Sequence, residues 1–160
     1  MFANRKSLMN IYNNILENKK ANKKSFALLI DPDKQDAKQL VSIIEKAEKA
    51  KTDYFFVGGS LLTHDSLDAC LRTLKAHANI PVILFPGNAM QVNEKADAIL
   101  FLSLISGRNA EMLIGKQVIT APILKQSSLE VLPTGYMLID SGKPTTVSYM
   151  SNTTPIPADK

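Results

Sequence analysis

Several short apolar runs in this 160-residue sequence end in acidic, hydroxyl or glycine residues, which are types that can bind metal ions and phosphates. Asp31 follows the run that ends at Ile30, and Ser60 follows Gly58 and Gly59. A carboxylate and a hydroxyl are hard oxygen ligands, and Mg²⁺ commonly takes one or two such ligands together with water and substrate phosphate oxygens. If the two runs are neighbouring strands, Asp31 and Ser60 could share one Mg²⁺ ion.

The residues around this pair suit an anionic substrate. Gly58 and Gly59 carry no side chains, so a phosphate could approach their backbone N–H groups closely. Lys34 adds a compact positive charge near the same place. A plainer interpretation also fits, in which residues 31–33 are a turn and helix cap and the two glycines belong to a loop. The residues alone leave both interpretations open.

Two later segments carry weaker signals. Residues 85–88 (Phe-Pro-Gly-Asn) end another apolar run, and Pro and Gly by themselves account for a strand end. Arg108 could bind an anion, although an Arg at a helix start is more often solvated. The sequence contains no Ser/His/Asp spacing, His-Glu-x-x-His, Walker or Gly-x-Gly-x-x-Gly motif, so hydrolytic triads and dinucleotide binding are poor interpretations.

Alternating strands and helices must position these residues. The strand runs are almost uniformly apolar, which is typical of parallel strands covered by helices, and in such folds the chemistry lies at the carboxyl ends of the strands. We expect strands at 25–30, 54–57, 80–85, 97–102 and 135–139, helices at 4–20, 35–50 and 108–116, a helix carried by Leu67, Cys70, Leu71 and Leu74 with Thr63 or Asp65 as its cap, and an extended piece at 145–149.

These five βα units form one predicted domain, residues 1–160, and leave two architectures open. A flavodoxin-like open sheet needs five strands, which a chain of this length supplies. A (β/α)8 barrel needs eight strands and about 250 residues. Length alone therefore favours the open sheet.

The composition excludes several classes of protein. A hydrophobic share of 45% and a charged share of 21% suit a globular chain rather than a disordered, collagen-like or coiled-coil one. The net charge of +4 is scattered without a basic stripe, so we expect no nucleic-acid partner. The single Cys70 excludes an internal disulfide. No apolar run approaches the roughly 20 residues that span a bilayer, and the first ten residues lack a signal-like apolar segment, so we expect a cytoplasmic protein without stable membrane insertion.

Taken in order, the strand-end sequences resemble the geranylgeranylglyceryl phosphate synthase family, including its bacterial prenylglyceryl phosphate synthase relatives. Each motif alone is weak, but their order and spacing are specific, and the similarity covers almost the whole chain after the opening helix. The segments that carry it are 28–34 (LLIDPDK), 56–60 (FVGGS), 82–88 (VILFPGN), 96–109 (ADAILFLSLISGRN), 133–140 (PTGYMLID) and 145–153 (TTVSYMSNT).

The resemblance implies an α/β fold of the (β/α)8 TIM-barrel type, with the first five or so βα units present in this chain. It implies a Mg²⁺-dependent prenyltransferase that joins a long-chain prenyl diphosphate of the geranylgeranyl type to sn-glycerol 1-phosphate, giving an ether-linked lipid precursor. Asp31 and Ser60 take the two Mg²⁺-ligand positions. The residues expected to contact substrate are Lys34, Gly58, Gly59, Gly87, Asn88 and Arg108.

The sequence departs from the family pattern at two places. Some members carry Lys two residues before the metal-binding Asp, where this chain has Leu29. The family's acidic catalytic residue and its glycine-rich phosphate loops lie on later strands, so in a protein of this kind we expect them beyond Lys160. This sequence resembles about two thirds of such a protein.

A barrel without those later strands exposes sheet edges, so we expect a homo-oligomer. Two alternatives to the prenyltransferase stay open. One is a flavodoxin-like phosphate- or nucleotide-binding protein, and the other is a non-catalytic barrel fragment that acts only by association.

Overall fold

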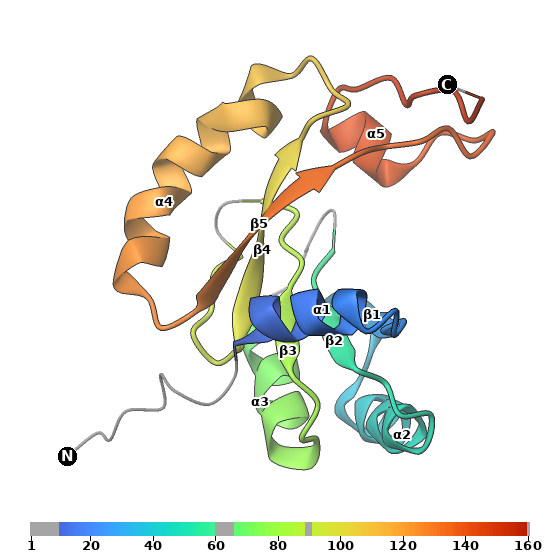
Figure 1. Ribbon diagram of the computed structural model, residues 1–160, viewed down its shortest axis with the longest axis vertical. Helices are drawn as coiled ribbons and strands as arrows, with labels where there is room; N and C mark the ends of the chain where they lie inside the picture. Colours follow the sequence, from blue (N-terminus) through green and yellow to red (C-terminus); the bar gives the residue numbers. More distant parts are fainter. Residues whose placement is uncertain (1–9, 60–65, 89–90, 160) are drawn as a thin grey trace.

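The computed structural model describes residues 10–59, 66–88 and 91–159, and it contains one parallel sheet (Figure 1). The five strands are hydrogen-bonded in the order of the chain. A flavodoxin-like sheet has the order 2-1-3-4-5, whereas a barrel is wound in one direction only. The open-sheet alternative is therefore wrong. The strands are β1 (Ala27–Ile30), β2 (Tyr54–Val57), β3 (Val82–Leu84), β4 (Ala98–Leu104) and β5 (Glu130–Tyr136).

The helices lie on two different sides of this sheet. The helices that follow β1, β2 and β4 pack on one face, as right-handed crossovers require, and the first helix lies across the other face (Figure 1). None of the helices among the described residues is long and apolar enough to cross a membrane. The helices are α1 (Ile11–Lys20), α2 (Ala37–Lys49), α3 (Leu67–His77), α4 (Lys116–Gln126), which continues a π-helical turn (Glu111–Gly115), and α5 (Thr146–Met150).

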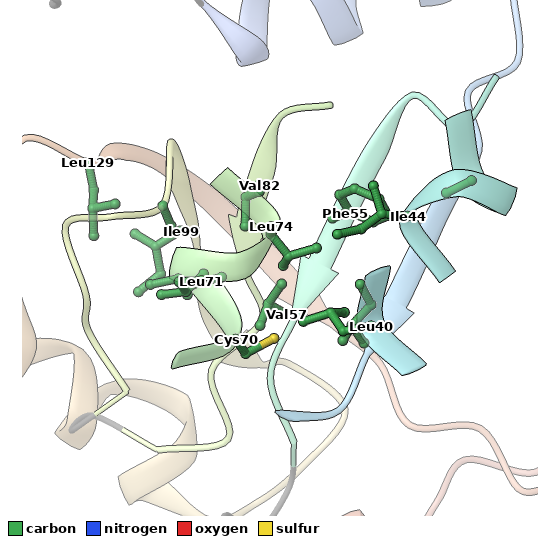
Figure 2. Close-up of a cluster of buried hydrophobic side chains, with 14 of the residues drawn as sticks. Leu40, Ile44, Phe55, Val57, Cys70, Leu71, Leu74, Val82, Ile99 and Leu129 are labelled. Atoms are coloured by element: carbon green, nitrogen blue, oxygen red, sulfur yellow. The ribbon is translucent and has the colours of Figure 1, made fainter. Parts of the chain in front are cut away.

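Alternate residues of β1 to β4 build the core on the helix face, and Figure 2 shows several of them. Phe55 and Val57 of β2 point toward α2 and α3, where Leu71 and Leu74 are fully buried. Burying one such side chain contributes about 1.5–3 kcal/mol. We therefore expect this layer to hold α2 and α3 against the sheet, with Leu71→Ala costing about 2–5 kcal/mol.

The opposite face of the sheet is covered at one end by α1. Ile11 is fully buried against a cluster that includes Tyr54 and Leu132. The Glu130 carboxylate at the start of β5 accepts hydrogen bonds from the Ile11 amide at 2.8 Å and the Tyr12 amide at 2.9 Å. A carboxylate at a helix N-terminus satisfies otherwise unpaired N–H groups and complements the helix dipole. Burial, followed by the charges of Asp53 and Glu130, raises the pKa of Tyr54.

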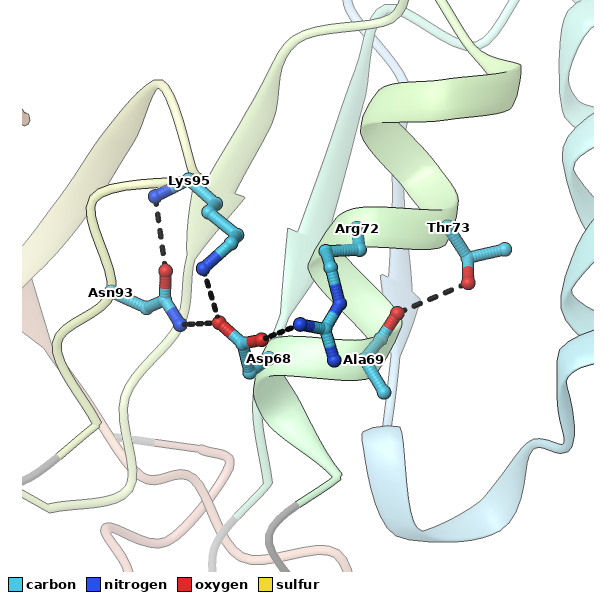
Figure 3. Close-up of polar contacts among 6 residues, drawn as sticks. All are labelled: Asp68, Ala69, Arg72, Thr73, Asn93 and Lys95. Carbon is cyan, nitrogen blue, oxygen red and sulfur yellow. Dashed lines mark hydrogen bonds and ion pairs between the residues drawn. The ribbon is translucent and has the colours of Figure 1, made fainter.

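An ionic cluster connects the start of α3 to the segment before β4 (Figure 3). The Asp68 carboxylate accepts hydrogen bonds from Lys95 Nζ at 2.6 Å and Asn93 Nδ2 at 2.9 Å, and Arg72 lies 2.9 Å from its other oxygen. The hydrogen bond from Lys95, followed by that from Asn93, lowers the pKa of the Asp68 carboxyl. The cluster therefore links two segments that are 25 residues or more apart in sequence.

The fifth strand is not where the sequence predicts it. We expected residues 135–139, but β5 runs from Glu130 to Tyr136. Pro133 and Gly135 argue against a strand, yet they are tolerated here. Even-numbered residues of β5 form the backbone hydrogen bonds to β4, as the Glu130 amide and the Tyr136 carbonyl do. The nitrogen of Pro133, which carries no hydrogen, therefore points away from β4 toward the outer edge of the described sheet, where no strand needs its hydrogen bond.

Two helices also differ from expectation. Residues 145–149 are predicted to be extended, but Thr145 instead caps α5, and Ser148 and Thr145 bond reciprocally in a capping box. The helix expected at 108–116 begins at Glu111 and continues through Pro122 to Gln126.

The remaining boundaries are close to the predictions. The first four strands begin and end within two residues of the expected positions. The helix α1 starts at Ile11, where the Asn10 side chain caps it by accepting from the Asn13 amide, and the expected start near residue 4 lies outside the described residues. Ser66 occupies the cap position of α3, and the expected caps Thr63 and Asp65 lie outside the described residues.

Candidate functional site

A cavity of about 540 Å³ opens at the carboxyl ends of the strands. Parallel strands bring their carboxyl ends to one edge, which is why residues far apart in sequence meet there. The cavity is lined by six of the predicted site residues, namely Asp31, Lys34, Gly58, Gly59, Gly87 and Asn88.

The other predicted positions are not part of this lining. Arg108 is exposed and does not line the cavity, so the structure does not bring it together with the other six. Ser60, the second expected Mg²⁺ ligand, lies outside the described residues. Lys160, beyond which we expect the acidic catalytic residue, also lies outside them, so no catalytic acid is assigned among the described residues and its position beyond Lys160 stays a prediction.

Asp31 has a structural contact as well as a place in the cavity. One carboxylate oxygen accepts a hydrogen bond from the Asp33 amide at 3.2 Å and caps the short 3₁₀ turn Pro32–Lys34. The other oxygen lies 3.0 Å from Lys34 Nζ. The cap and the ligand interpretations of Asp31 are therefore compatible. The Lys34 side chain is 75% exposed, so this ion pair is weak and can exchange for a bound anion.

Gly58 allows two strand ends to approach each other. A Cβ atom at this position would lie 1.9 Å from the Phe85 carbonyl oxygen, so no other residue fits without moving the backbone. The Gly58 amide donates to the Ile30 carbonyl at 3.1 Å and is already used in the sheet. Among the described residues no acceptor pairs with the Gly59 amide. Gly59 is therefore the better phosphate donor of the two.

Gln91 does not line the cavity, but it positions two residues that do, and nothing in the sequence indicated this role. Its side chain is almost fully buried; Oε1 accepts from the Gly87 amide at 2.8 Å, and Nε2 donates to the Gly59 carbonyl at 3.4 Å. Gln91 thus connects the loops after β2 and β3, and it uses the amide of Gly87, which we had expected to contact substrate. No periodic pattern marks a single glutamine in a loop, so the sequence offered no signal for it.

The apolar walls of the cavity were also not predicted. Leu29, which stands at the position where some relatives of the resembled family have Lys, is 55% exposed and contributes to the lining. Phe85 contacts the rings of Phe56 and Tyr136 edge-on, with centroids 6.0 and 5.9 Å apart. Further apolar lining residues come from β4 and from the helix after it, including Ile99, Leu100, Phe101, Leu102 and Met112.

The donor set at the cavity mouth fits Mg²⁺ better than a metal that needs a full protein cage. Within the described ranges, no group of three or more His, Cys, Asp or Glu side chains could hold a metal ion. Mg²⁺ needs only one or two carboxylates when substrate phosphates and water supply the other ligands. Asp31, at a cavity wide enough for a ligand, matches this mode of binding.

A parallel sheet in chain order, with helices on one face and a cavity at the carboxyl ends of its strands, defines part of a (β/α) barrel. Residues 15–160 match the sequence profile of the PcrB family. The chain therefore belongs to the PcrB family, which confirms both the family resemblance and the fold class predicted from the sequence.

Known relatives agree with this assignment. Over 150 residues the chain is 55% identical to a protein named geranylgeranylglyceryl phosphate synthase from Chitinophaga pinensis, covering 94% of this chain and 60% of that protein. A solved structure of (S)-3-O-geranylgeranylglyceryl phosphate synthase from Thermoplasma acidophilum, in complex with sn-glycerol-1-phosphate, superposes with a TM-score of 0.86 at 33% identity over 94% of this chain and 60% of that one. The GGGPS of Thermoplasma volcanium gives a TM-score of 0.84 at 31% identity, covering 93% of this chain and 59% of that one.

The chain spans about 60% of the length of the curated relatives it matches.

Proposed function

We propose that the complete protein is a prenyltransferase that joins a geranylgeranyl-type diphosphate to sn-glycerol 1-phosphate and forms an ether-linked prenylglyceryl phosphate for lipid biosynthesis. The observation that carries this proposal is the two-part character of the cavity. Its mouth holds Asp31, Lys34 and the Gly59 amide, and its walls are apolar. A prenyl diphosphate has the same two parts, a polyanionic head and a hydrocarbon tail. The names of the relatives support this assignment.

The chain's own residues bind and orient the donor in this proposal. The diphosphate lies at the carboxyl ends of β1 and β2, where the Gly59 amide donates to it and Lys34 turns from Asp31 to a phosphate oxygen. The tail lies along the apolar walls from Phe85 toward Leu100, which removes hydrocarbon from water at about 25 cal/mol per Å² buried. Excluding water from these walls also protects the allylic carbon from hydrolysis.

Asp31, and Ser60 by the family resemblance, would hold Mg²⁺ beside the diphosphate. Bound there, the ion would neutralise negative charge on the leaving group. The allylic C–O bond would break with its electron pair leaving on the diphosphate, while the acceptor oxygen forms the ether bond and passes its proton to a carboxylate or to water. Asp31 is suited to its role because one oxygen stays fixed by the Asp33 amide while the other can exchange Lys34 for the cation.

The remaining assignments complete the proposal. The acidic catalytic residue and the strands that bind the acceptor phosphate lie beyond Lys160 in the complete protein, as the family resemblance implies. Asn88 and Arg108 stay proposed substrate contacts, and Gly58 and Gly87 contribute backbone position rather than amide donors. We propose a cytoplasmic homo-oligomer that binds no nucleic acid and does not insert stably into a membrane.

The test is prenyl transfer by the complete protein with radiolabelled geranylgeranyl diphosphate. We expect a Mg²⁺-dependent lipid product with sn-glycerol 1-phosphate and much less with sn-glycerol 3-phosphate, the matched acceptor control. Asp31→Asn keeps the size of the side chain but removes its charge, so it is expected to lose most activity. No product with either acceptor would refute the reaction, and full activity of Asp31→Asn would refute the role of Asp31.

A further inference from the structure

Asp33 joins the turn that carries Asp31 to the start of α3. The Asp33 carboxylate accepts a hydrogen bond from Ser66 Oγ at 2.5 Å, although the two residues are 33 positions apart in sequence. The Asp33 amide donates to Oδ1 of Asp31 at 3.2 Å. Asp33 therefore contacts the candidate Mg²⁺ ligand with its backbone and a helix of the core layer with its side chain.

The hydrogen bond between Ser66 and Asp33 is of a strong kind. A hydroxyl that donates to a carboxylate forms a shorter and stronger bond than a pair of neutral groups does, with a usual length of about 2.5–2.7 Å. Both residues are partly buried, which limits the competition from water. This contact is therefore able to hold the two segments together.

Ser66 makes this contact instead of capping its own helix. A serine at the N-cap position ordinarily accepts a hydrogen bond from a backbone N–H group in the first turn of the helix. Ser66 occupies that position of α3, but its side chain forms no cap hydrogen bond. Its hydroxyl therefore serves the turn after β1 rather than the helix that it begins.

The turn that carries Asp31 depends on contacts with the rest of the protein. Pro32–Lys34 is a single 3₁₀ turn, and a helix of this length is not stable by itself. In contrast, α3 is firmly held, because Leu71 and Leu74 are fully buried against the sheet. The Asp33 carboxylate thus fastens a short turn to a rigid element, which is the arrangement that a precise ligand position requires.

We infer that Asp33 is a positioning residue that, held by Ser66, fixes the orientation of the Asp31 carboxylate toward bound Mg²⁺. Asp33 itself does not line the cavity, so it acts through Asp31 rather than on the ion. Partners that orient metal ligands in this way contribute about 10–100-fold to metal affinity. The inference rests on the proposed function, because it concerns the same metal site.

Calorimetry on the complete protein tests the inference, with an unreactive thio-analogue of geranylgeranyl diphosphate as the probe and with or without Mg²⁺. Asp33→Leu and Ser66→Ala each remove the contact, and each should reduce the Mg²⁺-dependent increase in affinity about tenfold. The double variant should lose no more than either single variant, because both residues act through one contact. Losses that simply add in the double variant would overturn the inference.

A conservative variant separates positioning from direct metal binding. Asp33→Asn keeps an oxygen that accepts from Ser66 but removes the charge, so it should retain most of the Mg²⁺ effect. If Asp33→Asn loses the effect while Ser66→Ala retains it, the charge of Asp33 acts directly and the inference is wrong.

Asp36→Ala is the matched control for a purely structural loss. Asp36 lies three residues after Asp33 and caps α2, and its hydrogen bonds go to Gln39 rather than to the turn of Asp31. Its loss should lower the thermal unfolding midpoint but leave the Mg²⁺ effect unchanged. Equal losses of the Mg²⁺ effect in Asp36→Ala and Asp33→Leu would overturn the inference and leave the proposed function intact. An unaltered protein whose affinity does not respond to Mg²⁺ would overturn both.

Discussion

Replacement of Gly58 by alanine tests the geometry that brings the ends of β2 and β3 together. The new Cβ would lie 1.9 Å from the Phe85 carbonyl oxygen and 2.7 Å from its carbonyl carbon. Carbon–oxygen contacts normally lie at about 3.3 Å, so the two strand ends must separate by roughly 1.4 Å. Overpacking of this kind lowers the free energy of unfolding by about 1–3 kcal/mol. Alanine also reduces the conformational entropy of the unfolded chain, which stabilises the folded protein by about 0.4–1 kcal/mol. We therefore expect a net loss of about 1–2 kcal/mol.

Thermal unfolding measures this loss directly. For a chain of this size 1 kcal/mol corresponds to about 2–4 °C, so the midpoint should fall by about 2–8 °C. Gly135→Ala is the matched control: its Cβ would lie 2.9 Å from Ile105 Cδ1, which is the mobile end of an exposed side chain, so the midpoint should hardly change. In the complete protein, the same displacement at the cavity should lower kcat about 100-fold. Equal midpoints for the two variants would refute the close approach.

Three further predictions concern the contacts that hold the elements in place. Glu130→Gln weakens the cap on α1 and should cost about 1–2 kcal/mol in urea unfolding, whereas Glu94→Gln, at an exposed position, should cost nothing; equal values would contradict the cap. The pKa of Asp68 is lowered in the folded protein, so its charged form stabilises the fold at pH values above the unfolded-state pKa of about 3.9, and this contribution is lost as the pH falls through the folded-state pKa. The difference in unfolding free energy between the parent and Asp68→Asn should therefore shrink in acid. A difference that does not depend on pH would argue against the pairing with Lys95. Burial raises the pKa of Cys70 to about 11, so iodoacetamide at pH 8 should modify Cys70 only after denaturation, and fast labelling of the native chain would contradict its burial.

The sequence predicted the fold well where apolar patterning determined it. The first four strands and α2 follow from uniform apolar runs and helical spacing. It failed at β5, because Pro133 and Gly135 argue against a strand when their edge position is not known. It failed at α5, because β-branched residues favour extended structure while the capping box of Thr145 and Ser148 favours a helix. Strand order, which excluded the flavodoxin-like sheet, is not encoded in any local pattern.

The candidate site was predicted only in part for a related reason. Asp31, Lys34 and the glycines could be predicted as site residues from their types and their positions after strands, because the carboxyl ends of parallel strands lie together at one edge of the sheet. The sequence does not reveal which backbone amides are already used, as those of Gly58 and Gly87 are. The bridging role of Gln91 and the apolar walls depend on contacts between segments far apart in the chain, so they became visible only in three dimensions.

The central claim is that Asp31 helps the cavity bind a prenyl diphosphate together with Mg²⁺, and calorimetry with an unreactive thio-analogue of geranylgeranyl diphosphate tests it most directly. The complete protein should bind this analogue more tightly when Mg²⁺ is added. In Asp31→Asn that increase should fall by about tenfold or more, which corresponds to at least about 1.4 kcal/mol. Binding that is independent of Mg²⁺, or equally strengthened by Mg²⁺ in both proteins, would contradict the account.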